Sequence, residues 1–216
     1  MLDKTSAVQD PEANAKKADT DRRAAELIGV DDDVVRKDAK NLVEQLRKYC
    51  GNGPHEHTLN MLRIVIAGAA GSGKTSIAVQ LAKELGVKNI DLDDFIPGGH
   101  TADKLEYERR FNRGLYEAWD SVPHKAGWII EHIGACNKDL VSLYSPSFAL
   151  LVDPGPERIR LAAAARAAVS DSGNEKDRLA RALETEKSSR KQFDSLHGTV
   201  LSREPKGYIL KALAEG

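Results

Sequence analysis

The segment that most restricts how this chain can fold is a glycine-rich stretch at residues 68–75, here called the glycine loop, which reads GAAGSGKT. The apolar run of residues 62–67 comes directly before it. Residues 75–85 follow with apolar side chains at helical spacing, and Gly86 is placed to end that helix. A continuous apolar strand, a tight glycine turn and a helix form the first unit of an α/β domain, in which helices cover both faces of a parallel sheet.

The glycine loop matches the pattern GxxxxGK[ST], in which successive backbone N–H groups point inward and surround a polyphosphate. In that pattern Lys74 reaches the β- and γ-phosphates, and the Thr75 hydroxyl ligates Mg²⁺. The sequence therefore predicts that the chain binds ATP and Mg²⁺. The predicted nucleotide-binding residues are Gly68, Ala69, Ala70, Gly71, Ser72, Gly73, Lys74, Thr75 and Ser76.

Short apolar runs continue to alternate with helical stretches along the rest of the chain. We therefore expect a P-loop NTPase fold: a three-layer α/β/α sandwich with a mainly parallel, five-stranded sheet. The expected strands are residues 62–67, 89–92, 128–131, 148–152 and 199–201, and the expected helices are residues 75–85, 103–119, 157–168, 175–196 and 205–213.

The N-terminal part of the chain has a different character. Residues 1–20 show no apolar period, so we expect a mobile tail there. Residues 31–50 carry apolar side chains at helical spacing and predict one amphipathic helix. Residues 51–57 contain the breakers that end this helix and are interpreted as a linker. His55 and His57 alternate in that linker without a further ligand nearby, so we interpret them as solvated rather than metal-bound.

Composition and charge limit which partners the chain can be expected to bind and in which cellular compartment it is expected. The chain has 216 residues and a formal net charge of −1, so its overall charge gives no reason to expect binding to nucleic acid or to a membrane surface. Cys50 and Cys136 lie far apart and in no metal-binding spacing, which favours a reducing compartment. No apolar run approaches ~18 residues, and the first residues lack a signal-peptide profile. We therefore expect a cytoplasmic protein without a membrane partner.

Three carboxylates follow the second expected strand, in the sequence Asp91-Leu92-Asp93-Asp94. Ligands of open parallel sheets bind at the carboxyl ends of the strands, so these side chains are expected beside the glycine loop. A carboxylate there can accept the proton of an attacking hydroxyl. We predict Asp93 for this role, with Asp91 as the main competitor because a D-x-D pair could hold Mg²⁺ or substrate with one member. The alternative is that these residues cap the helix that follows.

The glycine loop, the strand after it and the DLDDF sequence of residues 91–95 together resemble the small P-loop kinases. They are similar to uridine and nicotinamide riboside kinases and, through D-x-D, to shikimate and gluconate kinases. The resemblance covers about residues 61–213. It implies a kinase in which Lys74 is catalytic, and in which the first Asp of a D-[DS]-F motif, here Asp93, is the base.

The resemblance also implies an acidic residue that orients Mg²⁺, placed at the end of the strand 128–131. Glu131 matches this position and is preferred over Asp153, which follows another apolar run but begins a turn resembling the one that leads into the lid helices. His132 comes next in the chain. It is interpreted either as a substrate contact or as an ordinary loop histidine.

Arginines complete the set of candidate residues. The resemblance implies a lid over residues 157–197 within an α/β domain of residues 58–216, preceded by an extension of residues 1–57. Arg166 matches the lid arginine that closes on the transferred phosphate, and Arg178 and Arg181 are its candidate partners. Arg109, Arg110 and Arg113 either grip an anionic substrate or pair with Glu106, Glu108 and Glu117 on the helix surface.

The leading functional hypothesis is an ATP-dependent kinase that phosphorylates a hydroxyl of a small molecule, with a nucleoside or nucleotide favoured. A second hypothesis places the hydroxyl on a nucleic acid, as in polynucleotide kinases or the phage kinases of hydroxymethyluracil in DNA. A third is a nucleotide-dependent switch or ATPase, although the chain has no NKxD guanine motif. Toxin-like kinases of cell-wall sugars share the loop, and the sequence leaves the oligomeric state open.

Overall fold

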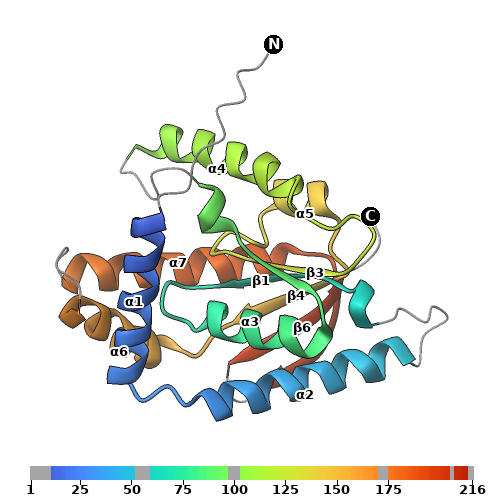
Figure 1. Ribbon diagram of the computed structural model, residues 1–216, viewed down its shortest axis with the longest axis horizontal. Helices are drawn as coiled ribbons and strands as arrows, with labels where there is room; N and C mark the ends of the chain where they lie inside the picture. Colours follow the sequence, from blue (N-terminus) through green and yellow to red (C-terminus); the bar gives the residue numbers. More distant parts are fainter. Residues whose placement is uncertain (1–10, 52–58, 97–102, 170–174, 205–206, 214–216) are drawn as a thin grey trace.

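A computed structural model describes residues 11–51, 59–96, 103–169, 175–204 and 207–213 (Figure 1). In these residues helices and strands alternate around one sheet, as the periodicity indicated. The elements are α1 (Pro11–Leu27), α2 (Asp32–Gly51), η1 (Leu59–Met61), β1 (Arg63–Gly68), α3 (Lys74–Leu85), β2 (Lys88–Asp91), η2 (Leu92–Phe95), α4 (Lys104–Trp119), β3 (Trp128–Glu131), α5 (Lys138–Tyr144), β4 (Phe148–Val152), α6 (Pro156–Val169), α7 (Glu175–Ser195), β5 (Gly198–Glu204) and β6 (Tyr208–Leu213).

The strands form one six-stranded sheet in the order β2-β3-β1-β4-β6-β5. The first four of these are parallel to one another, whereas β6 runs antiparallel to both β4 and β5. The carboxyl ends of β1, β2 and β3 therefore meet at one edge of the sheet. The glycine loop leaves the end of β1 at this edge and enters α3.

The sheet departs from the expectation of five mainly parallel strands. It has a sixth strand, and it is mixed, because β6 runs antiparallel to both of its neighbours, β4 and β5. Residues 205–213 were expected to be a helix, but Tyr208–Leu213 is β6, and residues 205–206 lie outside the described part of the chain. This segment forms a strand because of its contacts with a distant part of the chain. Pairing with β6 supplies partners for the backbone of buried β4, and an unpaired buried backbone group is costly.

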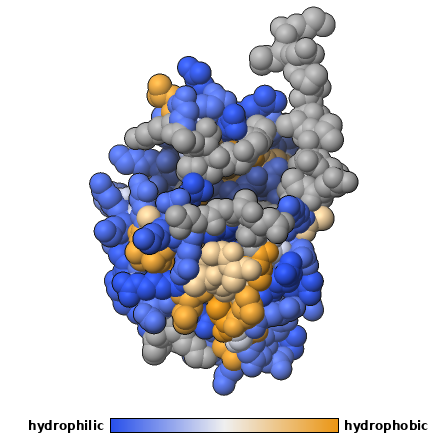
Figure 2. Space-filling view, turned by 90° about the vertical axis from the view of Figure 1, so that its left-hand side faces the viewer, coloured by the Kyte–Doolittle hydropathy of each residue, from blue (hydrophilic) through white to orange (hydrophobic). Residues whose placement is uncertain are grey.

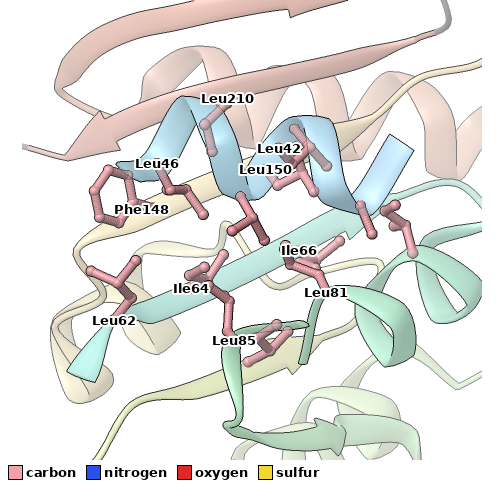
Figure 3. Close-up of a cluster of buried hydrophobic side chains, with 14 of the residues drawn as sticks. Leu42, Leu46, Leu62, Ile64, Ile66, Leu81, Leu85, Phe148, Leu150 and Leu210 are labelled. Atoms are coloured by element: carbon pink, nitrogen blue, oxygen red, sulfur yellow. The ribbon is translucent and has the colours of Figure 1, made fainter. Parts of the chain in front are cut away.

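Two apolar cores, one on each face of the sheet, confirm the three-layer arrangement. On one face Leu42 and Leu46 of α2 pack with Ile64, Leu150 and Leu210 of the sheet, together with residues of α3 (Figure 3). Helices α4, α5 and α7 supply side chains to the core on the other face. Each core removes apolar surface from water, which is the main favourable contribution to folding.

Strand β1 shows why its sequence is a continuous apolar run. Ile64 and Ile66 belong to the core beneath α2 and α3, while Val65 and Ala67 belong to the core beneath α4, α5 and α7. All four side chains are fully buried. A strand covered on both faces has no solvent side on which a polar residue would be favoured.

The N-terminal segment is more ordered than its sequence suggested. Residues 11–20 form the first part of α1, in contrast to the expected mobile tail, and residues 1–10 lie outside the described part of the chain. α1 packs against α6, and Ala24 is buried in α1. α2 is the expected amphipathic helix, with Ala39, Leu42 and Leu46 on its buried face. The linker histidines His55 and His57 fall outside the described residues.

The side of the molecule that carries α1 and α6 has an apolar patch among hydrophilic residues (Figure 2). Leu27 of α1 and Leu161 of α6 are exposed large apolar side chains. Among the described helices, none combines the length and apolar character needed to cross a membrane. Cys50 and Cys136 are both free and buried.

Candidate functional site

The glycine loop is held in a shape that requires its glycines. Gly73 precedes α3 with a left-handed φ of 90°, a conformation that is costly for residues with a Cβ. A Cβ on Gly68 would lie 2.5 Å from Ser72 Oγ and 2.7 Å from the carbonyl oxygen of Val152. A side chain at Gly68 would therefore meet its neighbours at too short a distance, and one at Gly73 would be in a strained backbone conformation.

The start of α3 is a ready anion site. No side chain caps it, and an added Cβ on Gly73 would meet no described atom within 4 Å. The first N–H groups of a helix have no partner within the helix, and the helix dipole is positive at this end. An anion placed here meets both features, which is how polyphosphate is held at helix N-termini.

Lys74 lies beside a buried carboxylate on the neighbouring strand. Its Nζ is 3.7 Å from Oε2 of Glu131, and Glu131 is completely buried. Burial is the main cause that raises the pKa of Glu131, and the charges of Asp91 and Asp93 act in the same direction, while Lys74 and the Thr75 hydroxyl lower that pKa. A cation bound here would favour the ionised form of Glu131.

The carboxylate of Glu131 also fits a hydrated metal ion. Both of its oxygens are buried and lack a well-aligned hydrogen bond within the described structure, and the Thr75 hydroxyl is a nearby donor. Orphaned buried acceptors of this kind call for an ion or water. No group of three or more His, Cys, Asp or Glu side chains in the described chain is arranged to hold a metal. The donors present are thus one carboxylate and the Thr75 hydroxyl, which suits Mg²⁺ because this ion keeps several of its waters.

Asp153, the competitor of Glu131, has a different environment. Its carboxylate forms an ion pair with Arg190 of α7, and its backbone N–H donates to Gly207 O at 2.6 Å. In the structure Glu131, rather than Asp153, is the carboxylate that contacts Lys74.

The three carboxylates after β2 have three different surroundings. Asp91 accepts a hydrogen bond from the backbone N–H of Asp93 at 3.0 Å, which caps η2. Asp93 Oδ1 lies 3.1 Å from Nε2 of His132, and Asp94 is exposed. Register places Asp91 directly opposite Glu131 in the sheet. Asp91 is therefore the residue that caps the following helix, as the alternative interpretation of these carboxylates expected. Asp93 is the residue that contacts His132 in the turn after β3.

His132 is almost fully buried at this edge. Its Nδ1 accepts a hydrogen bond from Gly134 N at 2.9 Å, and its ring lies 5.3 Å from the ring of Phe111. Tyr107 stacks on Phe111 at 6.3 Å, and both burial and the charge of Asp93 raise the pKa of Tyr107. Sequence reasoning missed these two aromatics, although their four-residue spacing on α4 places them on one helix face.

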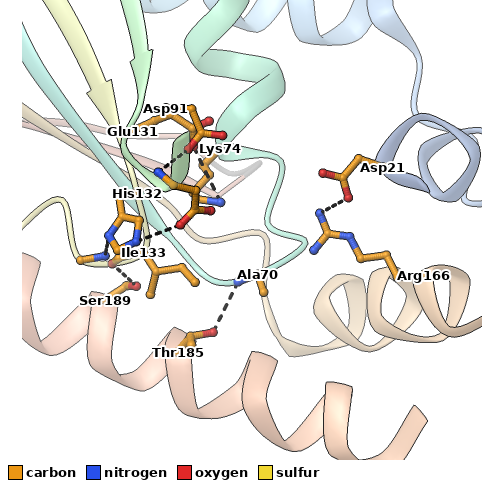
Figure 4. A network of polar contacts seen from close by, with 12 residues as sticks. Asp21, Ala70, Lys74, Asp91, Glu131, His132, Ile133, Arg166, Thr185 and Ser189 are labelled. Carbon is orange, nitrogen blue, oxygen red and sulfur yellow. Dashed lines mark hydrogen bonds and ion pairs between the residues drawn. The ribbon is translucent and has the colours of Figure 1, made fainter. Parts of the chain in front are cut away.

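Helices α6 and α7 pack over the glycine loop (Figure 4). The Ala70 N–H donates to Thr185 Oγ1 at 3.4 Å, and Ser189 Oγ donates to Ile133 O at 2.9 Å. Arg166 lies close to the loop, since its Nη1 would be 3.9 Å from a Cβ on Gly71. Its Nη2 is held 2.8 Å from Asp21 of α1. Thr185 and Asp21 are further residues of this region that the sequence did not single out.

The remaining candidate arginines lie on helix surfaces. Arg113 Nε is 2.6 Å from Glu117, and Arg110 Nε is 2.8 Å from Glu106. Arg109 and Arg181 are exposed, and Arg178 is half-buried. The pairing found for Arg110 and Arg113 is the surface alternative that the sequence left open.

Comparison with known proteins gives little beyond the geometry. No protein family model matches the chain, and no curated protein matches it. Among solved structures, a shikimate kinase from Bacteroides thetaiotaomicron aligns over 62% of this chain and 82% of its own, with 17% identity and a TM-score of 0.43. An uncharacterized protein from Eubacterium ventriosum aligns over 62% of this chain and 76% of its own, with 15% identity and a TM-score of 0.40. At TM-scores below 0.5, these matches contribute nothing to the assignment of function.

Proposed function

We propose that this chain is an ATP- and Mg²⁺-dependent kinase that transfers the γ-phosphoryl group to a hydroxyl of a small molecule. The observation that carries the proposal is the meeting of four features at one sheet edge. They are the uncapped start of α3, Lys74, the buried Glu131 and a second carboxylate, Asp93, in η2 directly after the neighbouring strand β2. Anion-binding, charge-neutralising and proton-accepting groups are what phosphoryl transfer needs from a protein.

The residues divide the work of the reaction. The backbone N–H groups of the glycine loop and the start of α3 bind the phosphates, and Lys74 neutralises charge on them. Thr75 and Glu131 would hold Mg²⁺, which, when bound, neutralises the charge that develops on the phosphate oxygens. Asp93 accepts the proton of the attacking hydroxyl as the new P–O bond forms, and the bond to the β-phosphate oxygen breaks to release ADP.

Two other features support parts of the proposal. The half-buried ring of Tyr107, stacked on buried Phe111, lies on the same side as Asp93 and His132, and an aromatic ring there favours a planar, nucleoside-like acceptor. Arg166 is close enough to the glycine loop to serve as the lid arginine, although Asp21 pairs with it in this structure. Release from Asp21 would let its guanidinium contact the transferred phosphate.

The test is transfer of label from γ-labelled ATP in the presence of Mg²⁺. Nucleosides and nucleotides, sugars and small acids, and single- and double-stranded DNA would be offered in parallel. Label on a small molecule is expected. Label on DNA would move the assignment to a nucleic-acid kinase, and label released only as phosphate would favour an ATPase or switch.

Paired variants connect the activity to this site. Lys74→Ala should abolish transfer and weaken ATP binding, whereas Lys83→Ala at the far end of α3 should change neither. Asp93→Asn should spare ATP binding and lower turnover on the order of 10²–10⁴-fold, as expected for a lost base. Its control is Asp94→Asn, one residue further on and exposed. Normal turnover of Asp93→Asn would remove Asp93 from the mechanism.

A further inference from the structure

We propose that His132 is a positioning residue, whose Nε2–H holds the carboxylate of Asp93 in the orientation that accepts the substrate proton. This inference rests on the proposed function and adds a residue to it. It differs from a direct substrate contact, because His132 would act through Asp93.

The first support is the hydrogen bond on the other side of the ring. Nδ1 of His132 accepts from the backbone N–H of Gly134 at 2.9 Å, so Nδ1 carries no proton. A neutral imidazole has one N–H, which must then be on Nε2. Nε2 is the atom that lies 3.1 Å from Asp93 Oδ1. A fixed acceptor bond on one nitrogen thus directs a donor toward Asp93, in the way that such bonds set the tautomer of catalytic histidines.

The second support is that this donor is buried and lacks an aligned acceptor. Only 2% of His132 is exposed, and Nε2 has no hydrogen-bond partner within the described structure, because its contact with Asp93 is close but not aligned. An unsatisfied buried N–H is costly. A small rotation of the half-buried Asp93 side chain would align the contact, and catalytic hydrogen bonds commonly tighten in this way when substrate binds.

The third support is that the histidine is the better anchored partner. Its backbone N–H donates to Ile66 O of β1 at 3.1 Å, and its ring packs on Phe111. The next residue, Ile133, accepts a hydrogen bond from Ser189 of α7 at 2.9 Å. Three elements therefore fix the turn after β3. The Asp93 side chain, on η2, is 39% exposed, whereas that of His132 is 3% exposed, so the histidine is the more deeply buried of the two.

Two substitutions test the roles of the two ring nitrogens of His132 one at a time. His132→Gln keeps a donor at the position of Nε2, and His132→Asn keeps an acceptor for Gly134 N–H at the position of Nδ1 but has nothing to offer Asp93. We expect His132→Gln to retain kcat within a few fold. His132→Asn should lose about 10- to 100-fold in kcat, the effect of a misplaced catalytic group, with the KM values for ATP and acceptor unchanged. Thermal unfolding would show that both variants fold.

Other kinetic results would overturn the proposal. Equal kcat for His132→Asn and the wild type would show that Asp93 needs no support. A raised KM for the acceptor with unchanged kcat would show that His132 contacts the substrate itself, and equal losses in both variants would show a packing role.

A readout without turnover keeps this inference distinct from the proposed function. With ¹⁵N-labelled histidine at a pH of about 8, NMR should show His132 as the Nε2–H tautomer with an N–H proton protected from exchange. Asp93→Ala should make that proton exchange faster. If the protein shows no kinase activity but this result holds, the pair exists and the proposed function fails. If the tautomer is Nδ1–H, or the proton exchanges no faster in Asp93→Ala than in the wild type, the inference fails whatever the activity.

Discussion

The tight packing of Gly68 allows a quantitative test of the loop geometry. A Cβ at this position would lie 2.5 Å from Ser72 Oγ and 2.7 Å from the carbonyl oxygen of Val152. Nonbonded heavy atoms come to rest at about 3.5–4.0 Å. Rotation of the Ser72 side chain can relieve the first clash. The second clash involves the backbone of β4, which is paired in register with Gly68, so β1 and β4 would have to separate locally.

The size of the effect follows from this forced separation. Overpacking of a well-packed site costs about 1–3 kcal/mol of unfolding free energy. In a domain of this size each kcal/mol lowers the Tm by about 2–4 °C, so Gly68→Ala should lower it by about 2–12 °C. ATP binding should weaken as well, because the displaced backbone carries the N–H groups that bind phosphate.

Thermal and urea unfolding would measure this change against two further variants. Gly51→Ala is the control, since an added Cβ at the end of α2 meets no described atom within 4 Å, and we expect little change. The double variant Gly68→Ala/Ser72→Gly should recover only part of the loss, because the clash with Val152 remains. If Gly68→Ala unfolds at the wild-type midpoint, the close approach of the glycine loop to β4 is wrong.

Two smaller predictions concern residues away from the loop glycines. Burial raises the pKa of the Cys136 thiol to about 12, so very little thiolate is present near neutral pH in the folded protein. A thiol reagent at pH about 8 should leave Cys136 unmodified until the protein is unfolded, and rapid labelling of the native protein would contradict its burial. Asp21→Asn removes the partner of Arg166; because both side chains are partly exposed, it should cost no more than about 1 kcal/mol of unfolding free energy. The same variant should tighten ATP binding if the released guanidinium contacts phosphate, whereas Asp19→Asn, which affects an exposed pair with Arg22, should leave the ATP Kd unchanged; weaker ATP binding in Asp21→Asn would contradict this role of Asp21.

The glycine loop and its flanking elements could be predicted because their determinants are local. The apolar run before the loop, the glycines within it and the helical spacing after it all lie within 25 consecutive residues. The parallel alignment of β1, β2 and β3 then follows from the α/β alternation, and it brings Asp91 opposite Glu131. The structure of such a segment can be predicted from sequence because its local pattern agrees with the overall fold.

β6 could not be predicted in the same way, because its conformation depends on a distant partner. Its six residues include Lys211, whose ammonium is buried and donates to the carbonyl oxygens of Phe193 and Leu196 at the end of α7. A lysine in a short apolar run indicates neither strand nor helix by itself. Burial of this charged group becomes acceptable only once α7 supplies acceptors for it.

The order of α1 likewise arises from contacts rather than from its own pattern. Its sequence is polar on average, and an isolated helix of 17 residues is marginal in water. Ala24 is buried, α1 packs against α6, and Asp21 forms an ion pair with Arg166 of α6. Tertiary context of this kind overrides a weak local signal.

The contacts of α7 limit how a lid over residues 157–197 could move. Thr185 accepts from the glycine loop, Ser189 donates to the turn after β3, and Arg190 pairs with Asp153 at the end of β4. Phe193 is buried in the core on this face of the sheet. The second half of α7 is therefore part of the core, and a lid that moved as one body would have to break all of these contacts. Arg166 lies on α6, before these contacts in the chain, and is held by Asp21 of α1 beside the glycine loop.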